Sequence, residues 1–387
     1  MNNRLNFNSP IFKILIMFLT WRFILVIVSI LAIYFLPLGY KDRFLGGGPT
    51  NYQLSPWFFS WANFDGEHYL SISIFGYKYL EQAFFPVYPM IMSFFSRPNA
   101  FDLLLSLINS TVVGLLISNV SFLLALIVLW ELIRIDFSKK IAYLTIILII
   151  VFPTSFYFGA VYNESLFLLL SVLSFYFARK GNWMAAGLIG MVSSATRIFG
   201  IFLLPALLIE AWQQKASLGI FIWILLIPAG LGVYMIYQFF TVGDFIAFYH
   251  LQKIVGEQHQ SGFTLLPQVY YRYVKMLLTV GIQNPIFQTI VLEFAVGILF
   301  FLLPVYGYFK KIRLSYLVYA MLGFLAPTIQ GSFSSVPRYV IVFFPSFLAV
   351  AFWINSLPKY MRIIILLLSF SALIIESSLF LRGYWVA

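Results

Sequence analysis

The sequence predicts an all-α protein that crosses a membrane many times. The chain of 387 residues is 62% hydrophobic and 10% charged, whereas a soluble domain has about 25% charged residues. Its apolar runs of about 20 residues match helices that cross a hydrocarbon core of ~30 Å. The runs lack the alternation of a membrane barrel, and an open sheet would leave backbone groups unpaired in lipid.

Breaks between the apolar runs place about eleven helices. The expected ranges are 10–37, 103–133, 140–158, 163–179, 183–196, 199–213, 217–240, 286–309, 313–330, 338–357 and 361–382. The ranges 183–196 and 199–213 are short for two full spans, so they form either a tight hairpin or a re-entrant element. The first run is too long for the apolar part of a signal peptide, so we expect it to be retained. We expect residues 1–387 to form one membrane-embedded domain.

Lysine and arginine orient the helices, because these residues accumulate in cytoplasmic connections. With a cytoplasmic N-terminus and an extracytoplasmic C-terminus, the short inner segments contain more than half of the 24 basic residues: Arg4, Lys13, Arg134, Lys139, Lys140, Arg179, Lys180, Lys215, Lys310, Lys311, Arg313, Lys359 and Arg362. The long loops 38–102 and 241–285 then lie outside, and we expect interfacial helices in the first. The net charge of +11 reflects this topology and attraction to lipid headgroups, so no nucleic-acid partner is expected.

Several kinds of chemistry are excluded by composition and motif. The chain has no cysteine, so it has no disulfide, thiolate nucleophile or cysteine-based metal site. It contains neither a G-x-x-x-x-G-K-[ST] motif nor a strand-linked G-x-G-x-x-G motif, so we expect no cytoplasmic nucleotide-binding loop.

Ionisable residues in or beside membrane spans are costly and therefore indicate function. Asp65, Glu164, Arg197 and Arg338 come from separate parts of the chain, and the predicted topology puts all four on the outer side. Arg22 lies in the middle of the first helix and is not expected to join them. The four residues predict a pocket in which carboxylates transfer protons and guanidinium groups bind an anion such as phosphate.

Most of these residues also have a structural explanation. Asp65 would cap a helix that starts near Gly66, and Glu164 would favour its helix N-terminus through the helix dipole. Arg338 would anchor a helix end by reaching to the interface. Arg197 is harder to explain, because the apex of a short hairpin is a poor place for such an anchor.

The histidines allow a further alternative. His68 lies among aromatic residues, where a packing role is the commoner one. His250, His259 and Glu257 in the second outer loop could bind a metal together with His68, but their spacing is not diagnostic of a metal site. We expect no metal and no cofactor, since arginines can supply the positive charge that a phosphate needs.

Several motifs follow one another along the chain. The pattern D-x-E-H-[FY]-L occupies residues 65–70, G-Y residues 76–77 and A-F-F-P-x-[FY]-P residues 83–89. Three later stretches are "PTSFYFGAVYNESLF" (153–167), "SSATRIFGIFLLPAL" (193–207) and "SVPRYVIVFFP" (335–345). Together these motifs resemble the PIG-V family of mannosyltransferases, part of the GT-C superfamily. Asn163 and Ile198 stand where the family often has a small hydroxyl residue, and the compact length favours a prokaryotic relative.

The resemblance implies a GT-C fold with its active site in the first extracytoplasmic loop. It implies an inverting glycosyltransferase whose donor is a polyprenyl- or dolichyl-phosphate sugar, with mannose typical of the family, and whose acceptor is a lipid, glycan or protein. Asp65 falls at the family's catalytic carboxylate, so we expect it to be the base. The expected substrate-binding residues are Glu67, His68, Tyr88, Asn163, Glu164, Arg197 and Arg338, with the two arginines on the phosphate. The enzyme would act in a prokaryotic plasma membrane, or in the endoplasmic reticulum of a eukaryote.

A transporter or flippase of lipid-linked sugars is the main alternative. It would share the apolar composition and a phosphate-binding arginine. However, it would be expected to show broken helices in corresponding halves of the chain, and access to the site from both sides of the membrane. A membrane O-acyltransferase would need a histidine near a cytoplasmic acyl donor, and the predicted topology places no histidine there.

Overall fold

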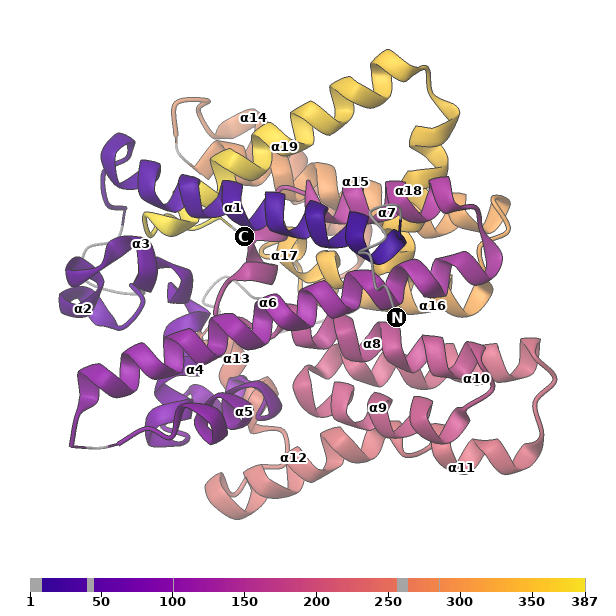
Figure 1. The fold of residues 1–387 in the computed structure, drawn as a ribbon, viewed down its shortest axis with the longest axis horizontal. Coiled ribbons are helices and arrows are strands. Elements are labelled where there is room, and N and C mark those ends of the chain that lie inside the picture. The colour runs from indigo at the N-terminus through magenta and orange to yellow at the C-terminus, as the bar shows by residue number, and fades with distance from the viewer. Residues whose placement is uncertain (1–8, 40–44, 100, 256–263, 285, 387) are drawn as a thin grey trace, which may run out of the picture.

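The computed structural model describes residues 9–39, 45–99, 101–255, 264–284 and 286–386. Over these residues the regular elements are helices, and no β-strand occurs. The prediction of an all-α membrane protein is therefore confirmed. Figure 1 shows the longer helices running roughly along one direction, with shorter helices at one end.

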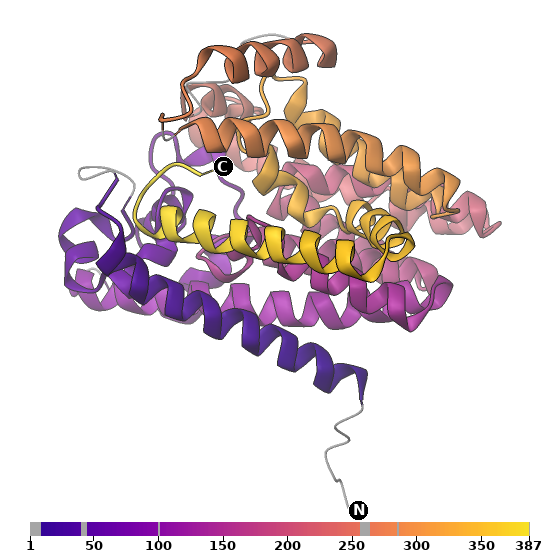
Figure 2. The ribbon, with the colours of Figure 1, turned by 90° about the horizontal axis from the view of Figure 1, so that it is seen from above.

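Five helical segments within the described residues are long and apolar enough to cross a membrane. They are α1 (Pro10–Phe35), α6 (Leu103–Asp136), the segment Leu218–Val242, α15 (Ile286–Phe309) and α19 (Lys359–Leu381). A bent helix pair would make a sixth span. The first and last of these helices, α1 and α19, pack side by side, as Figure 2 shows. The count of eleven spans and their orientation stay predictions.

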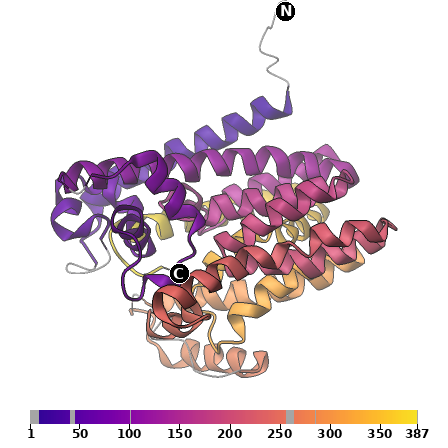
Figure 3. The same ribbon diagram turned by 90° about the horizontal axis from the view of Figure 1, so that it is seen from below.

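Shorter helices complete the bundle and its two long connections. Those within the bundle are α7 (Lys139–Ile150), α8 (Glu164–Arg179), α9 (Trp183–Thr196), α10 (Leu203–Gln213), α11 (Phe221–Ile224), α12 (Ile227–Val242), α16 (Leu314–Thr328), α17 (Val336–Tyr339) and α18 (Phe344–Ser356). The first long loop carries α2 (Gly48–Leu54), α3 (Pro56–Phe59), α4 (Asp65–Phe75) and α5 (Val87–Ser96). The second carries α13 (Ala247–Val255) and α14 (Leu266–Thr279). Figures 1 and 3 show α2–α5 gathered at one end of the long helices.

Proline explains why two of the expected helices break. The expected helix 140–158 ends at Ile150, and Pro153 follows. The expected helix 338–357 is divided at Phe343, where the chain bends by 88° between Val336–Val342 and α18. Pro345 occupies the first turn of α18. A proline ring has no N–H and clashes with the carbonyl group four residues earlier, which favours a break at each of these positions.

Residues 183–213 form two short helices joined by a tight turn. Helix α9 ends at Thr196, a short 3₁₀ turn covers Ile198–Phe202, and α10 follows at once. Gly200 makes this possible, because a Cβ atom there would lie 2.4 Å from the backbone nitrogen of Ser194. Any side chain at this position would push the turn away from α9.

Packing of the bundle brings three helix starts together. Helix α6 packs along α8, and α8 packs against α9. Helix α4 contacts α6, while α17 contacts α15 and α16. The first residues of α4 and α8 therefore lie near the short helix α17, at the end of the bundle where the first long loop sits.

Candidate active site

Four of the predicted site residues meet in one ion cluster, made of Asp65, Glu164, Arg197 and Arg338. Nη1 of Arg338 lies 2.6 Å from Oδ2 of Asp65. Nε of Arg338 donates a hydrogen bond to Oε1 of Glu164 at 2.7 Å. Nη1 of Arg197 lies 2.8 Å from the same Glu164 oxygen. The structure thus joins the four residues that the topology placed on one side.

The members of the ion cluster differ in exposure. Glu164 is 0% exposed, and Arg197 and Arg338 are each 7% exposed, while the side chain of Asp65 is 26% exposed. Buried charges are tolerated when opposite charges and hydrogen bonds compensate them. Two carboxylates and two guanidinium groups cancel here, and Asp65 is the most exposed member of the ion cluster.

Aromatic rings surround the two guanidinium groups. The central carbon of the Arg338 guanidinium lies 4.7 Å from the ring centre of Tyr162 and 5.2 Å from that of Tyr157. The corresponding Arg197 carbon lies 5.4 Å from the ring centre of Phe199. Stacking of this kind suits arginine, whose charge is delocalised and weakly hydrated.

A strained turn sets the position of Asp65. Phe64 precedes α4 with a φ of 57°, a conformation that non-glycine residues rarely adopt. The neighbouring Asn63 is held on two sides: its side chain accepts from the Gly46 N–H at 2.8 Å, and its carbonyl accepts from the Tyr162 hydroxyl at 2.8 Å. The cap position of α4 belongs to Phe64, and Asp65 is its first residue. The helix-cap explanation for Asp65 is therefore wrong.

Asn163 fixes the spacing between Glu164 and Arg197. It directly precedes α8, and its side-chain amide donates to the carbonyl of Thr196 at 3.0 Å. Thr196 is the last residue of α9, and Arg197 follows it. The hydrogen bond thus ties together the two backbone segments that carry the Glu164–Arg197 pair.

Sequence reasoning missed the residues that hold Arg338 in place. Ser335 has a φ of 61° and precedes α17, and its N–H donates to Oε1 of Glu293 at 3.3 Å. The other oxygen of Glu293 accepts from the Tyr273 hydroxyl at 2.6 Å. On the other side, the Thr154 hydroxyl donates to the carbonyl of Pro337 at 2.7 Å. Glu293 was detectable as a carboxylate within an apolar run, but its partner Tyr273 comes from a distant loop.

Glu67 and His68 lie in α4 and make contacts of their own. Oε1 of Glu67 accepts from the Gly48 N–H at 3.0 Å. Burial raises the pKa of Glu67 to about 7, against the smaller lowering effect of that hydrogen bond. The His68 ring stacks on Phe84 with centres 4.5 Å apart, which agrees with a packing role. Neither residue has an ion pair with the cluster in the part of the chain that the structure describes.

The structure does not bring Tyr88 into the cluster. Its side chain is 0% exposed, and its hydroxyl donates to the carbonyl of Gly114 at 2.9 Å. The same oxygen lies 2.9 Å from the hydroxyl of Ser118. These contacts fasten α5 to α6, so Tyr88 supports the fold around α4.

The contemplated histidine metal site gains no support from the described residues. Among them, no group of three or more His, Cys, Asp or Glu side chains could hold a metal ion. Nδ1 of His250 lies 2.6 Å from Oδ2 of Asp244, and His68 is stacked on Phe84. His259 and Glu257 lie outside the described residues.

The fold and the ion cluster define an integral membrane protein with a charged centre among its helices. Residues 46–216 match the family Mannosyltransferase (PIG-V). This match confirms, over that part of the chain, the resemblance that the motifs indicate. The matched part includes Asp65, Glu164 and Arg197.

Solved structures of an oligosaccharyltransferase from Archaeoglobus fulgidus are similar to this chain at low identity. The structure tethered to an acceptor peptide has 14% identity and a TM-score of 0.44, with 95% of this chain and 55% of that chain covered. The apo form has 14% identity and a TM-score of 0.43, with 96% and 56% covered. The chain thus spans about half the length of these structures. No curated protein sequence matches the chain.

Proposed function

We propose that this protein transfers a sugar, mannose in the family's usual case, from a polyprenyl-phosphate donor to an acceptor hydroxyl on the extracytoplasmic face. The observation that carries the proposal is the ion cluster, in which one partly exposed carboxylate, Asp65, contacts a buried arginine, Arg338. A base and a phosphate-binding cation are the two groups that this reaction needs side by side.

The proposed reaction is a single displacement. The acceptor oxygen forms a bond to the anomeric carbon, and the bond from that carbon to the phosphate oxygen breaks. The bonding electrons leave with the polyprenyl phosphate, and Asp65 takes the acceptor proton. The configuration at the anomeric carbon is inverted, because the acceptor attacks from the face opposite the phosphate.

The charges of the cluster fit this step. Two carboxylates and two arginines sum to zero, and the donor adds the single negative charge of its phosphodiester. During transfer, the leaving phosphate gains one negative charge while Asp65 loses its own by protonation. Nη1 of Arg338, which lies 2.6 Å from Oδ2 of Asp65, can then turn its charge to the phosphate. The fully buried Glu164 keeps both arginines in place.

The second candidate, a flippase, is less well supported. Transporters of this kind are built from repeats, so their broken helices recur in corresponding halves. Among the described residues, one helix pair, Val336–Val342 with α18, is bent at a short break. The ion cluster also lies at one end of the bundle, whereas a flippase needs access to its site from both sides of the membrane.

The test is a transfer assay with purified protein in lipid vesicles. Polyprenyl-phosphate mannose is added with a lipid, glycan or peptide acceptor, and free polyprenyl phosphate and sugar-bearing acceptor are measured. Release that depends on an acceptor supports the proposal. Movement of the donor across the bilayer without release would favour the flippase instead.

A further inference from the structure

Arg22 is a charged residue inside a membrane helix that the ion cluster does not use. It lies near the middle of α1, and its guanidinium carbon is 4.2 Å from the ring centre of Trp61. Its Nη1 is buried and has no hydrogen-bond partner among the described residues. A cation in a membrane span costs several kcal/mol unless partners compensate it, and the Trp61 ring supplies only part of that compensation.

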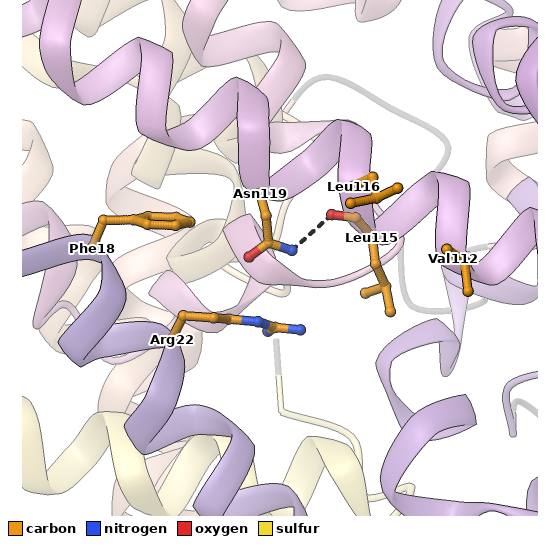
Figure 4. Close-up of a pocket in the computed structure, with 6 residues that line it drawn as sticks. All are labelled: Phe18, Arg22, Val112, Leu115, Leu116 and Asn119. Carbon is orange, nitrogen blue, oxygen red and sulfur yellow. Dashed lines mark hydrogen bonds between the residues drawn. The ribbon is translucent and has the colours of Figure 1, made fainter. Parts of the chain in front are cut away.

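Arg22 and Asn119 line an open cavity of about 290 Å³ between α1 and α6, and its exposed lining is almost entirely apolar. In Figure 4 the side chains of Arg22 and Asn119 extend from the two facing helices into this space. The amide of Asn119 donates to the carbonyl of Leu115 at 2.7 Å, which leaves its buried Oδ1 without a partner among the described residues. The remaining lining is apolar: Phe18, Val112, Leu115 and Leu116.

The cavity lies at the same depth as the ion cluster. Ser118, next to Asn119, donates to the carbonyl of Tyr162 at 3.0 Å, two residues before Glu164. Measured along the helices, Asn119 and Glu164 are each roughly 22 Å from the arginine in the last turn of their helix, at about 1.5 Å per residue. With the predicted orientation, this level is in the outer leaflet.

The mouth of the cavity faces lipid. Beside it, α1 and α6 present apolar side chains that are more than half exposed, such as Leu19 at 53%, Phe23 at 66%, Leu116 at 58% and Val120 at 54%. In a membrane, hydrocarbon chains cover surfaces of this kind. A molecule that enters the cavity from this side therefore has an apolar tail, and its polar end reaches Arg22.

We propose that Arg22 and Asn119 bind the head of an anionic phospholipid from the outer leaflet, one whose headgroup carries a hydroxyl. The guanidinium group would hold the phosphate, which arginine binds through paired hydrogen bonds. The unpartnered carbonyl oxygen of Asn119 would accept from the hydroxyl. The acyl chains would lie along the exposed faces of α1 and α6.

This lipid is distinct from the sugar donor. The donor phosphate belongs to Arg197 and Arg338 in the proposed function, and residues 157–162 lie between those groups and Arg22. Gly159 in this segment is closely packed, since a Cβ atom there would lie 2.7 Å from Nη1 of Arg22. The bound lipid would also steady Trp61, whose carbonyl accepts from the Val161 N–H at 2.9 Å just before the turn that positions Asp65.

The experiment counts the lipids retained by the purified full-length protein. The protein is placed in phosphatidylcholine nanodiscs with a small fraction of phosphatidylglycerol, and native mass spectrometry measures the phosphatidylglycerol bound. Arg22→Gln is expected to weaken this binding by roughly tenfold, the factor for one charge-assisted contact, and Arg22→Lys to retain part of it. Lys13→Gln is the matched control, because it removes an exposed charge from the same helix.

A second comparison tests Asn119. Phosphatidylmethanol has the same charged phosphodiester but no headgroup hydroxyl. Wild-type protein should prefer phosphatidylglycerol over it, and Asn119→Leu should lose this preference while keeping the charge-dependent binding. Thermal unfolding of each variant shows whether the fold is intact.

Three results would overturn the proposal. In the first, Arg22→Gln retains as much phosphatidylglycerol as the wild type. In the second, Lys13→Gln loses as much phosphatidylglycerol as Arg22→Gln, so that binding reflects overall charge. In the third, added polyprenyl phosphate displaces phosphatidylglycerol one for one, which would make the cavity part of the donor site. Because the readout involves no sugar transfer, failure here leaves the proposed glycosyltransferase activity unaffected.

Discussion

Arg338 joins two carboxylates from distant parts of the chain: its Nη1 lies 2.6 Å from Asp65, and its Nε donates to Glu164 at 2.7 Å. Glu164 is fully buried, whereas the Asp65 side chain is 26% exposed. One arginine therefore links a structural carboxylate to a reachable one, and variants of these residues should separate stability from catalysis.

Asp65→Asn should keep the fold and abolish most of the transfer. Asparagine has nearly the same shape as aspartate but cannot accept the proton of the acceptor hydroxyl. We expect the turnover rate to fall roughly a hundredfold or more, the usual contribution of a general base. Acceptor-dependent release of polyprenyl phosphate measures the rate, and thermal unfolding serves as the control. Near-normal turnover by a folded variant would remove Asp65 from the proposed mechanism.

Arg338→Gln should destabilise the protein by about 3 kcal/mol or more, because it leaves buried Glu164 with one cation instead of two. Adding Glu164→Gln should recover part of that loss, since the uncompensated carboxylate is then gone. Unfolding in detergent measures both effects. Lys359→Gln removes an exposed charge and should have little effect. The pairing would be contradicted if the double variant lost more free energy of unfolding than the two single variants lose together.

Tyr273→Phe should lower turnover with only a small change in stability. The Tyr273 hydroxyl donates to Glu293, which in turn accepts from the N–H of Ser335, three residues before Arg338. Without this hydrogen bond Arg338 would be held less firmly, and this matters more in the transition state than in the complex with bound donor. We therefore expect kcat to fall by about tenfold and KM to change less. Tyr271→Phe on the same helix is the control, because Tyr271 is 69% exposed. Equal effects from both variants would argue against a positioning role.

Glu67 should make stability depend on pH. It lies in α4, outside the long membrane helices, and burial raises its pKa from 4.5 to about 7. The folded state therefore binds the proton more tightly than the unfolded state does. Protonated Glu67 therefore adds to the free energy of unfolding. This contribution is fully present below pH 4.5 and is lost as pH rises through 7, and it amounts to at most about 3 kcal/mol for this shift. The free energy of unfolding, measured across this pH range, should lose this pH-dependent part in Glu67→Gln. If the variant keeps the wild-type pH dependence, Glu67 is not its source.

Glu210 should affect stability alone. It lies in α10, where Arg179 and Arg313 approach its carboxylate to 3.2 and 3.0 Å and Gln214 donates at 2.7 Å. Glu210→Gln should weaken these contacts and lower the unfolding temperature. The KM for the donor should remain near the wild-type value, because the ion cluster lies at the other end of α8. A large rise in KM would show that the two charged groups are coupled.

Much of the fold was predictable because, in lipid, the backbone has few alternatives to a helix. A backbone without water must satisfy its hydrogen bonds internally, so each expected range contains a helix. The expectations were wrong mainly where proline ends a helix early, at Ile150 and at Phe343. Asp65, Glu164, Arg197 and Arg338 were identifiable because unneeded charges are rarely retained near a bilayer.

Composition and motif spacing were enough to predict the class of protein and the residues that gather at one end of it, since both follow from the high cost of exposing polar groups to hydrocarbon. Which charges touch became clear only from the packed helices. Contacts such as Arg338 with Asp65, or Tyr273 with Glu293, join segments far apart in the chain. Arg22 likewise acquires its cavity only when α1 packs on α6. Such pairings depend on helix packing and side-chain direction, and neither can be derived from the local order of residues.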